Sequence, residues 1–360
     1  METSYVPGVA DAGAGRSFLV GAVLAGAAVA LFLSWILAGV GGSHTTLQVD
    51  DVGQWVAAWC ATAVCCVAAV RVPRARATWA LFAVSSFAWG AGEAVWCYYA
   101  LVRNVPVPFP SLADVGFLCA IPPAFAALLV YPGARRGTGD RGLGLLDSCI
   151  IATSLLFASW ATILGPMFRA HQGTVLKQVI SLAYPMSDVV MVSLVIILIA
   201  RGGRPVRVDI ALVMAGVVAF AVADSSFTYL TGVNDYSGGS FLDTGWVAGY
   251  LLIALGGLWA VTSPRTVPDQ IEGSTASLVA PYVPVLIVLA VTSVQLLRGK
   301  QMEPVSWLMA LALVLMVLGR EALNMWYRTA GDRRGQPGGE PPADRPRSLD
   351  PGIDAVAAGR

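Results

Sequence analysis

The chain has 360 residues, of which 56% are hydrophobic and only 12% are charged, and its formal net charge is +1. Soluble domains carry about 25% charged residues, so this composition excludes an ordinary water-soluble domain and indicates a bilayer as the main solvent. The near-neutral charge gives no support for a nucleic-acid partner.

Side chains that hold metals or support nucleophilic catalysis are scarce. The two histidines, His44 and His171, lie far apart between apolar blocks, and all six cysteines lie inside such blocks. We therefore expect no disulfide framework, no metal site, no cofactor and no histidine-dependent catalytic centre.

Ten apolar blocks are each long enough to cross a bilayer, since a hydrocarbon core of about 30 Å needs about 20 helical residues. A helix also satisfies its own backbone hydrogen bonds in lipid, and the blocks are too long and too continuous for barrel strands. The sequence therefore predicts an all-α, polytopic membrane bundle. The predicted spans are residues 17–40, 52–70, 77–101, 111–131, 143–166, 176–200, 208–231, 241–262, 278–298 and 304–328.

Three regions are expected from this pattern. Residues 1–16 form an N-terminal segment, residues 17–329 form the ten-helix transmembrane domain, and residues 330–360, rich in Gly, Pro, Arg and Asp, form a disordered tail. No catalytic domain is expected, and the protein is predicted not to be an enzyme.

Arginines predict the orientation of the bundle, because positively charged loops stay in the cytoplasm. The loops after the second, fourth and sixth blocks each carry three arginines, and the opposite loops carry fewer. Both termini are therefore predicted to be cytoplasmic.

Two stretches of the sequence match each other. In each, a carboxylate is followed by an aromatic residue at +3 and a tyrosine at +5, and later by Ser-x-x-Asp with Gly at +2 and an aromatic at +3. Blocks 77–101 and 111–131 are thus predicted to repeat as blocks 208–231 and 241–262. Asp147 and Asp188 mark the fifth and sixth blocks as a degraded third copy. The matched residues are Glu93, Trp96, Tyr98, Ser111, Asp114, Gly116 and Phe117, and Asp224, Phe227, Tyr229, Ser240, Asp243, Gly245 and Trp246.

The predicted topology places these acids in the extracytoplasmic half of the bundle, where a buried Asp costs about 2.5–3.5 kcal/mol. Because basic residues lie only at the rim, the acids must be protonated, hydrated or bound to a cation. Aromatic residues at i+3 share the helix face of each acid, and an acid beside an aromatic ring suits an amine or other organic cation. The candidate ligand-binding residues are Glu93, Trp96, Asp114, Phe117, Tyr184, Asp188, Asp224, Phe227, Asp243 and Trp246.

Structural explanations compete with this hypothesis. Asp114 and Asp243 each follow a serine by three residues, as in a helix N-terminal capping box. Glu93, Asp188 and Asp224 lie too deep for capping, and the alternative for them is a polar hub that holds helices together.

Several short motifs resemble the N-terminal membrane region of actinobacterial GGDEF and GGDEF–EAL proteins. They are Trp-Gly-x-Gly-Glu93, Pro-Ser-x-Ala-Asp114, Ala-Tyr-Pro-x-x-Asp188, Ala-Asp224-Ser and Leu-Asp243-x-Gly-Trp. The resemblance covers roughly residues 17–328 and implies a bacterial plasma-membrane sensory module. No GGDEF or EAL sequence follows Arg328, so cyclic-di-GMP chemistry is not carried over.

The sequence therefore favours a sensor-like or ligand-binding membrane module with an outward acidic and aromatic cavity and no output domain of its own. The expected partners are the lipid bilayer, a small cationic or amine ligand, and a cytoplasmic or membrane signalling partner. The alternative is a secondary transporter or cation-coupled carrier, which also uses repeats and intramembrane carboxylates. A lipid-directed enzyme is disfavoured because no Asp-x-x-Asp or His cluster lies at a cytoplasmic helix end.

Overall fold

The computed structural model describes residues 9–131, 141–169, 174–201, 207–232, 238–263, 282–299 and 301–335, and every regular element in these ranges is helical. The predicted all-α membrane bundle is confirmed. The elements are α1 (Val9–Ala38), α2 (Gly42–Arg71), η1 (Pro73–Ala75), α3 (Arg76–Cys97), η2 (Tyr98–Val102), α4 (Leu112–Val130), α5 (Arg141–Ser159), η3 (Trp160–Leu164), α6 (Gly165–Arg169), α7 (Val175–Arg201), α8 (Val208–Gly232), η4 (Phe241–Asp243), α9 (Thr244–Thr262), α11 (Tyr282–Leu297) and α12 (Pro304–Gly335).

Nine helical segments in the described ranges are long and apolar enough to cross a membrane. They correspond to nine of the ten predicted spans. The predicted ninth span, 278–298, is represented by α11, which has 16 residues, and residues 278–281 lie outside the described ranges. Large apolar side chains such as Leu19 and Leu308 are 63% and 68% exposed, as expected where lipid rather than water surrounds the bundle.

One predicted boundary was wrong, the start of the second span. The apolar segments at the two ends run over Gly15–Ala38 and Pro304–Tyr327, close to the predicted spans 17–40 and 304–328, within helices that begin at Val9 and end at Gly335. Residues 1–8 and 336–360 lie outside the described ranges. Helix α2 begins at Gly42, ten residues before the predicted 52, because no Pro or Gly interrupts residues 43–52. This earlier start places Asp50 and Asp51 within a helix instead of in a loop.

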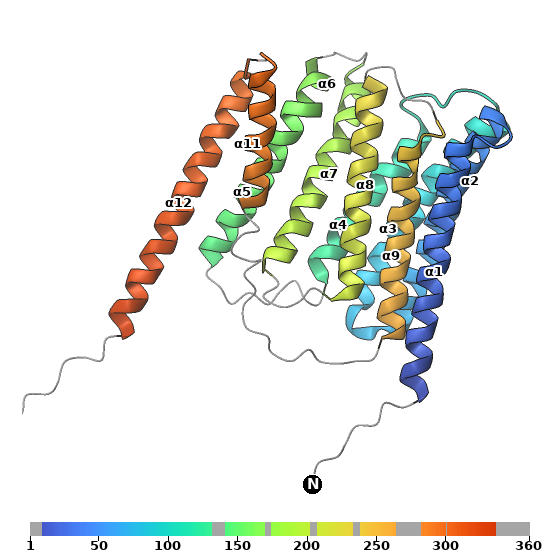
Figure 1. The fold of residues 1–360 in the computed structure, drawn as a ribbon, viewed down its shortest axis with the longest axis horizontal. Coiled ribbons are helices and arrows are strands. Elements are labelled where there is room, and N and C mark those ends of the chain that lie inside the picture. Colours follow the sequence, from blue (N-terminus) through green and yellow to red (C-terminus); the bar gives the residue numbers. More distant parts are fainter. Residues whose placement is uncertain are drawn as a thin grey trace, which may run out of the picture. The chain divides into compact units, whose positions relative to one another are not determined.

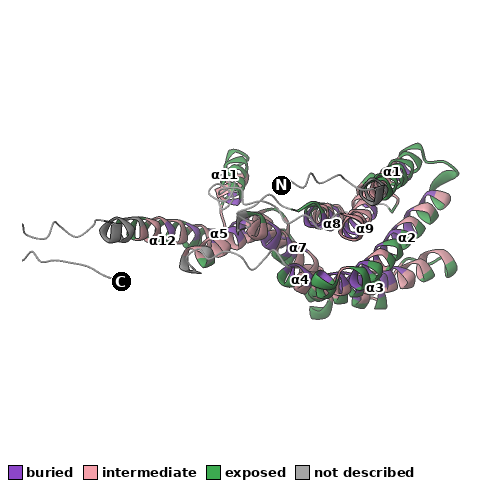
Figure 2. Ribbon diagram, turned by 90° about the horizontal axis from the view of Figure 1, so that it is seen from below, coloured by how far each residue is buried: buried purple, intermediate pink, exposed green. Residues whose placement is uncertain are grey.

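The chain forms two compact units, and the first of them, which ends at Arg320, holds the bundle described here. In this unit α2 packs on α3 and α9, α3 packs on α4, and α8 packs on α9 and α7. Figure 1 shows α1, α2, α3 and α9 running side by side. Trp79 and Phe82 of α3 lie at the centre of the main apolar core with Val213 of α8 and Ile253 of α9. Buried residues accordingly lie where these helices face one another (Figure 2).

The hairpins α3–α4 and α8–α9 pack in the same register, as the matched sequences predict. A Cβ atom on Gly116 of α4 would lie 2.5 Å from the Gly92 backbone and 2.8 Å from the Ala88 oxygen. A Cβ atom on Gly245 of α9 would lie 2.8 Å from the Ala223 Cβ atom and 3.1 Å from the Ala219 oxygen. In both hairpins, therefore, the glycine two residues after the Ser-x-x-Asp aspartate contacts the residue before the first acid and the residue four positions earlier.

A second pair of contacts, deeper in each hairpin, keeps the same register. The Ser85 hydroxyl donates to the Ala120 carbonyl oxygen at 2.7 Å. At the matching positions, a Cβ atom on Gly216 would lie 2.8 Å from the Gly249 carbonyl oxygen. The two hairpins are thus alike in how their helices cross, which goes beyond similarity of composition.

The proposed third copy differs from these two hairpins in where its acids lie. Asp147 lies near the start of α5, whereas Glu93 and Asp224 lie near the ends of their helices. Asp147 also accepts a hydrogen bond from Arg320 Nε at 2.6 Å, and Asp188 lies in the middle of α7. The degraded third copy therefore stays a prediction.

The close glycine contact gives a direct test of the packing. Gly116→Ala should lower the stability of the detergent-solubilised protein by about 1–3 kcal/mol, because the added carbon meets backbone atoms that cannot move aside. Gly245→Ala should also destabilise the protein. The matched control is Gly26→Ala in α1, where a Cβ atom meets nothing within 4 Å and the change should stay within about 0.5 kcal/mol. Thermal unfolding measures both, and equal midpoints for Gly116→Ala and Gly26→Ala would contradict the described crossing.

Candidate functional site

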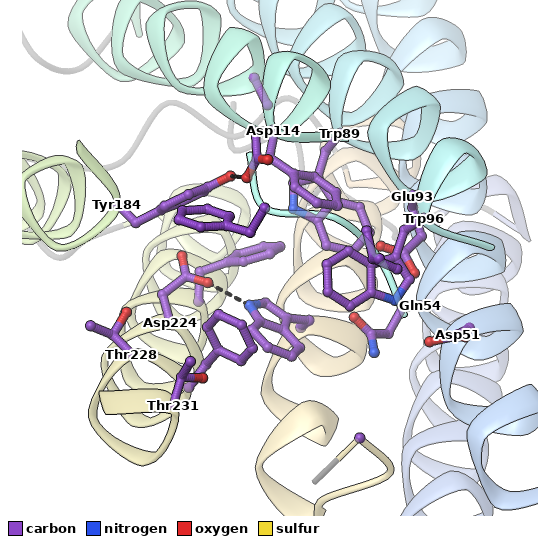
Figure 3. A pocket seen from close by; sticks show the side chains of 18 of the residues that line it. Asp51, Gln54, Trp89, Glu93, Trp96, Asp114, Tyr184, Asp224, Thr228 and Thr231 are labelled. Carbon is purple, nitrogen blue, oxygen red and sulfur yellow. Dashed lines mark hydrogen bonds between the residues drawn. The ribbon is translucent and has the colours of Figure 1, made fainter. Parts of the chain in front are cut away.

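A cavity of about 1150 Å³ lies at the end of the bundle where α3 and α8 end and α4 and α9 begin. Its walls come from α2, α3, α4, α7, α8 and α9, with further residues from η2, the segment between η2 and α4, η3 and α6. Figure 3 shows side chains from these helices facing the same space. This one cavity collects nine of the ten predicted candidates, which are Glu93, Trp96, Asp114, Phe117, Tyr184, Asp188, Asp224, Phe227 and Trp246. The tenth, Asp243, is fully buried behind the wall.

Six carboxyl groups line the cavity, and they form two groups on different helices. We call the first the α2–α3 acid cluster; it comprises Asp50, Asp51 and Glu93. We call the second the α7–α8 acid cluster; it comprises Asp188 and Asp224, with Asp114 of α4 nearby.

In the α2–α3 acid cluster, the carboxyl groups of Asp50 and Asp51 have identifiable hydrogen-bond donors. Gln54 Nε2 donates to Asp50 Oδ1, and the Gly239 amide donates to Asp50 Oδ2, both at 3.0 Å. A side-chain hydrogen bond also joins Asp50 to Asp243, which requires a proton on one of the two carboxyl groups. Asp51 accepts a hydrogen bond from the Trp96 side chain.

Glu93 differs from these neighbours. Its side chain is only 3% exposed, and the hydrogen-bond donor found for it among the described residues is the Cys97 thiol, with Sγ 4.0 Å from Oε1. A thiol is a weak donor, so this buried carboxyl group at the cavity wall has little compensation from the protein.

In the α7–α8 acid cluster, hydrogen-bond donors are again distributed unequally between the carboxyl groups. Trp246 Nε1 donates to Asp224 Oδ1 at 2.7 Å, as Figure 3 shows. Asp188 Oδ2 is buried and accepts no hydrogen bond from an N–H or hydroxyl group of the described residues. Its neighbour is the Asp224 carboxyl group, and the hydrogen bond between the two exists only when they share a proton.

Asp114 and Asp243 also serve the local fold. Each carboxylate accepts from the backbone N–H of the serine three residues earlier, at 2.6 Å from Ser111 and 2.8 Å from Ser240. Both therefore complete capping boxes, as the structural alternative predicted. Asp114 in addition accepts a hydrogen bond from the Tyr184 hydroxyl at 2.7 Å. This one side chain therefore caps α4 and also lines the cavity.

Aromatic rings separate the two acid clusters. The Trp89 ring centroid lies 4.9 Å from that of Tyr250 and 6.4 Å from that of Phe220, and Phe220 lies 4.6 Å from Tyr250. We call these three residues the aromatic floor. Tyr250 of α9 lines the cavity with its ring against Trp89 of α3 and Phe220 of α8.

The ion pairs among the described residues do not involve the acids that line the cavity. They join Arg169 to Glu303, Arg207 to Asp209 and Arg320 to Asp147. Lys177 does line the cavity, with its Nζ atom 5.8 Å from the centroid of the Phe109 ring. No group of three or more His, Cys, Asp or Glu side chains within the described ranges has the arrangement of a metal site.

Sequence reasoning missed Asp50, Asp51, Gln54 and the aromatic floor. Asp50 and Asp51 lie just before residue 52, where the hydropathy pattern predicts the start of the second span, and the helix in fact begins at Gly42. The available signal was the i,i+4 spacing of Asp50 and Gln54, which places both on one helix face once the helix is extended.

No family model, curated protein or solved structure matches the chain. What the fold and cavity define is a class: a polytopic α-helical membrane protein with an acidic and aromatic cavity inside its bundle.

The hydrogen bond between Trp246 and Asp224 can be tested by removing its donor. Trp246→Phe keeps the ring but leaves Asp224 Oδ1 without the indole N–H, and this should cost about 1–3 kcal/mol of stability. Trp307→Phe is the control, since Trp307 is 62% exposed, and its effect should stay within about 0.5 kcal/mol. Thermal unfolding in detergent compares the two, and the assignment is wrong if they lose equal stability.

Proposed function

We propose that the protein is a sensor-like, ligand-binding module of a bacterial plasma membrane whose cavity takes a small organic cation. One observation carries the proposal: six carboxyl groups line a single cavity of about 1150 Å³, and the ion pairs of the described residues lie elsewhere. Buried acids without cations are costly, so a positively charged occupant would be stabilised there.

The aromatic lining supports an organic cation over a bare ion. Trp96 and Phe117 lie beside Glu93, with ring centroids 6.5 Å apart, and Phe227 and Trp246 lie beside Asp224, with ring centroids 5.8 Å apart. A cation over an aromatic face gains about 0.5–2 kcal/mol, and apolar parts of the ligand would pack on the same rings. The cavity volume is also typical of sites for small organic molecules.

In this proposal the cavity faces the side opposite the cytoplasm, as the distribution of arginines among the loops predicts. A ligand would then enter from outside, and its binding would be transmitted through the helices to a partner at the cytoplasmic face. The resemblance to the membrane regions of GGDEF proteins supports this sensory role.

Binding can be tested with an alkylammonium ion such as pentylammonium. It should raise the thermal unfolding midpoint of the purified full chain. Pentanol, which is neutral, and pentanoate, which is negatively charged, have the same chain length and should not raise it. The double variant Glu93→Gln with Asp224→Asn should lose this stabilisation. Glu303→Gln, which removes an acid outside the cavity, should keep it. An unchanged shift in the double variant would contradict the proposal.

Orientation is tested separately with reporter fusions. Alkaline phosphatase fused after Asn104, in the segment between η2 and α4, should be active because it would be exported. The same enzyme fused after Arg74, in η1, should be inactive. The opposite pattern would place the cavity on the cytoplasmic side.

A carrier is the alternative, and the hydrogen bond between the carboxyl groups of Asp188 and Asp224 favours it, since a shared proton is a means of coupling flux to protonation. Proteoliposomes with an imposed proton gradient separate the two functions. Accumulation of labelled alkylammonium would indicate a carrier, and binding without accumulation supports the sensor.

A further inference from the structure

The cavity has two places for positive charge, which is more than binding of a simple organic cation requires. The lining acids fall into two groups by the helices that carry them. Asp50, Asp51 and Glu93 lie on α2 and α3, and Asp188 and Asp224 lie on α7 and α8. Figure 3 shows Glu93, Trp96 and Gln54 together and Asp224 with Thr228 and Thr231 apart from them, with aromatic rings in between.

The repeat explains why there are two such places. Glu93 and Asp224 occupy matching positions in hairpins α3–α4 and α8–α9, which cross in the same register. Trp96 and Phe227 match as the rings at +3, and Phe117 and Trp246 match as the rings that contact them. Each hairpin thus contributes one acid with a pair of aromatic rings to the common cavity.

Each place also contains a buried oxygen that the protein leaves poorly satisfied. In the α2–α3 acid cluster it is the Glu93 carboxyl group, which is 3% exposed and whose one donor among the described residues is a thiol at 4.0 Å. In the α7–α8 acid cluster it is Asp188 Oδ2, which lacks an N–H or hydroxyl donor among the described residues. An ammonium group has three N–H donors and a positive charge, and it would satisfy either oxygen.

The surface between the two places is apolar. The aromatic floor of Trp89, Phe220 and Tyr250 is continuous, with neighbouring ring centroids 4.6 to 6.4 Å apart. Such a surface favours methylene groups and offers little to a polar linker.

We propose that the ligand is a dication in which two ammonium groups are joined by an apolar spacer, as in an α,ω-diamine or a polyamine. One ammonium group would bind at Glu93, the other at Asp224 and Asp188, and the spacer would cross the aromatic floor. This inference rests on the proposed binding of an organic cation and specifies its chemical class.

The test compares α,ω-diamines of increasing length with alkylamines of equal length, by isothermal titration calorimetry on the full chain in detergent. One diamine length should bind about a hundredfold more tightly than its matched monoamine, since the second contact becomes intramolecular. Shorter and longer diamines should lose this advantage. A shorter diamine cannot reach both clusters, and a longer one must bend to place both ammonium groups.

Single variants sharpen the comparison. Glu93→Gln and Asp224→Asn should each lower the affinity for the best diamine about a hundredfold. Each should lower the affinity for the monoamine only about twofold, because the other place remains available. Asp51→Asn and Asp188→Asn serve as second variants in the two clusters if either of the first pair fails to fold. Glu303→Gln is the control and should change neither affinity.

The outcomes distinguish this inference from the proposed function. Equal affinity for diamines and monoamines, or sensitivity of diamine binding to only one cluster, would overturn the two-site ligand and leave the binding of an organic cation intact. Failure of both amine classes to bind would overturn both proposals.

Discussion

Carboxyl groups buried inside a membrane bundle are the constraint on which this structure depends. A carboxylate in hydrocarbon is costly, and the bundle places its acids where helices from both hairpins meet, away from lipid. Some of them are compensated by the protein itself, as Asp50 is by Gln54 and Gly239. Glu93, in contrast, has only the weak Cys97 thiol as a donor within the part of the chain that the structure describes. This unequal compensation separates the acids that hold the fold together from those available to a ligand.

Close helix packing is what brings the acids to a common depth. Without side chains at Gly92 and Gly116, α3 and α4 approach until backbone atoms are in contact, and Gly245 allows α9 to approach α8 at the matching position. The crossing points lie next to Glu93 and Asp224 in sequence, so the same contacts that fix the hairpins also fix the two acids. Stability and site geometry therefore share the same residues.

Much of this organisation could be predicted from the sequence. Nine of the ten predicted spans, the helical class and the repeated hairpin followed from block length and from the spacing of acids, glycines and aromatic residues. The α2 boundary could not be found from hydropathy, because Asp50 and Asp51 lower the apolar signal where the helix is in fact continuous. The aromatic floor was missed for another reason. Trp89, Phe220 and Tyr250 come from different helices, and only the packing of α3 against α8 and α9 brings them together.

The bond between the Gly239 amide and Asp50 has a consequence for how the protein is made. The two residues are 189 positions apart in the chain, whereas the contacts within each hairpin are local in sequence. During synthesis the α3–α4 hairpin can form as soon as it is inserted, but Asp50 must wait until α8 has been inserted and the segment leading into α9 arrives. The α2–α3 half of the cavity is thus completed late in biogenesis, and truncated chains that end before Gly239 would enter the membrane with that acid only partly satisfied.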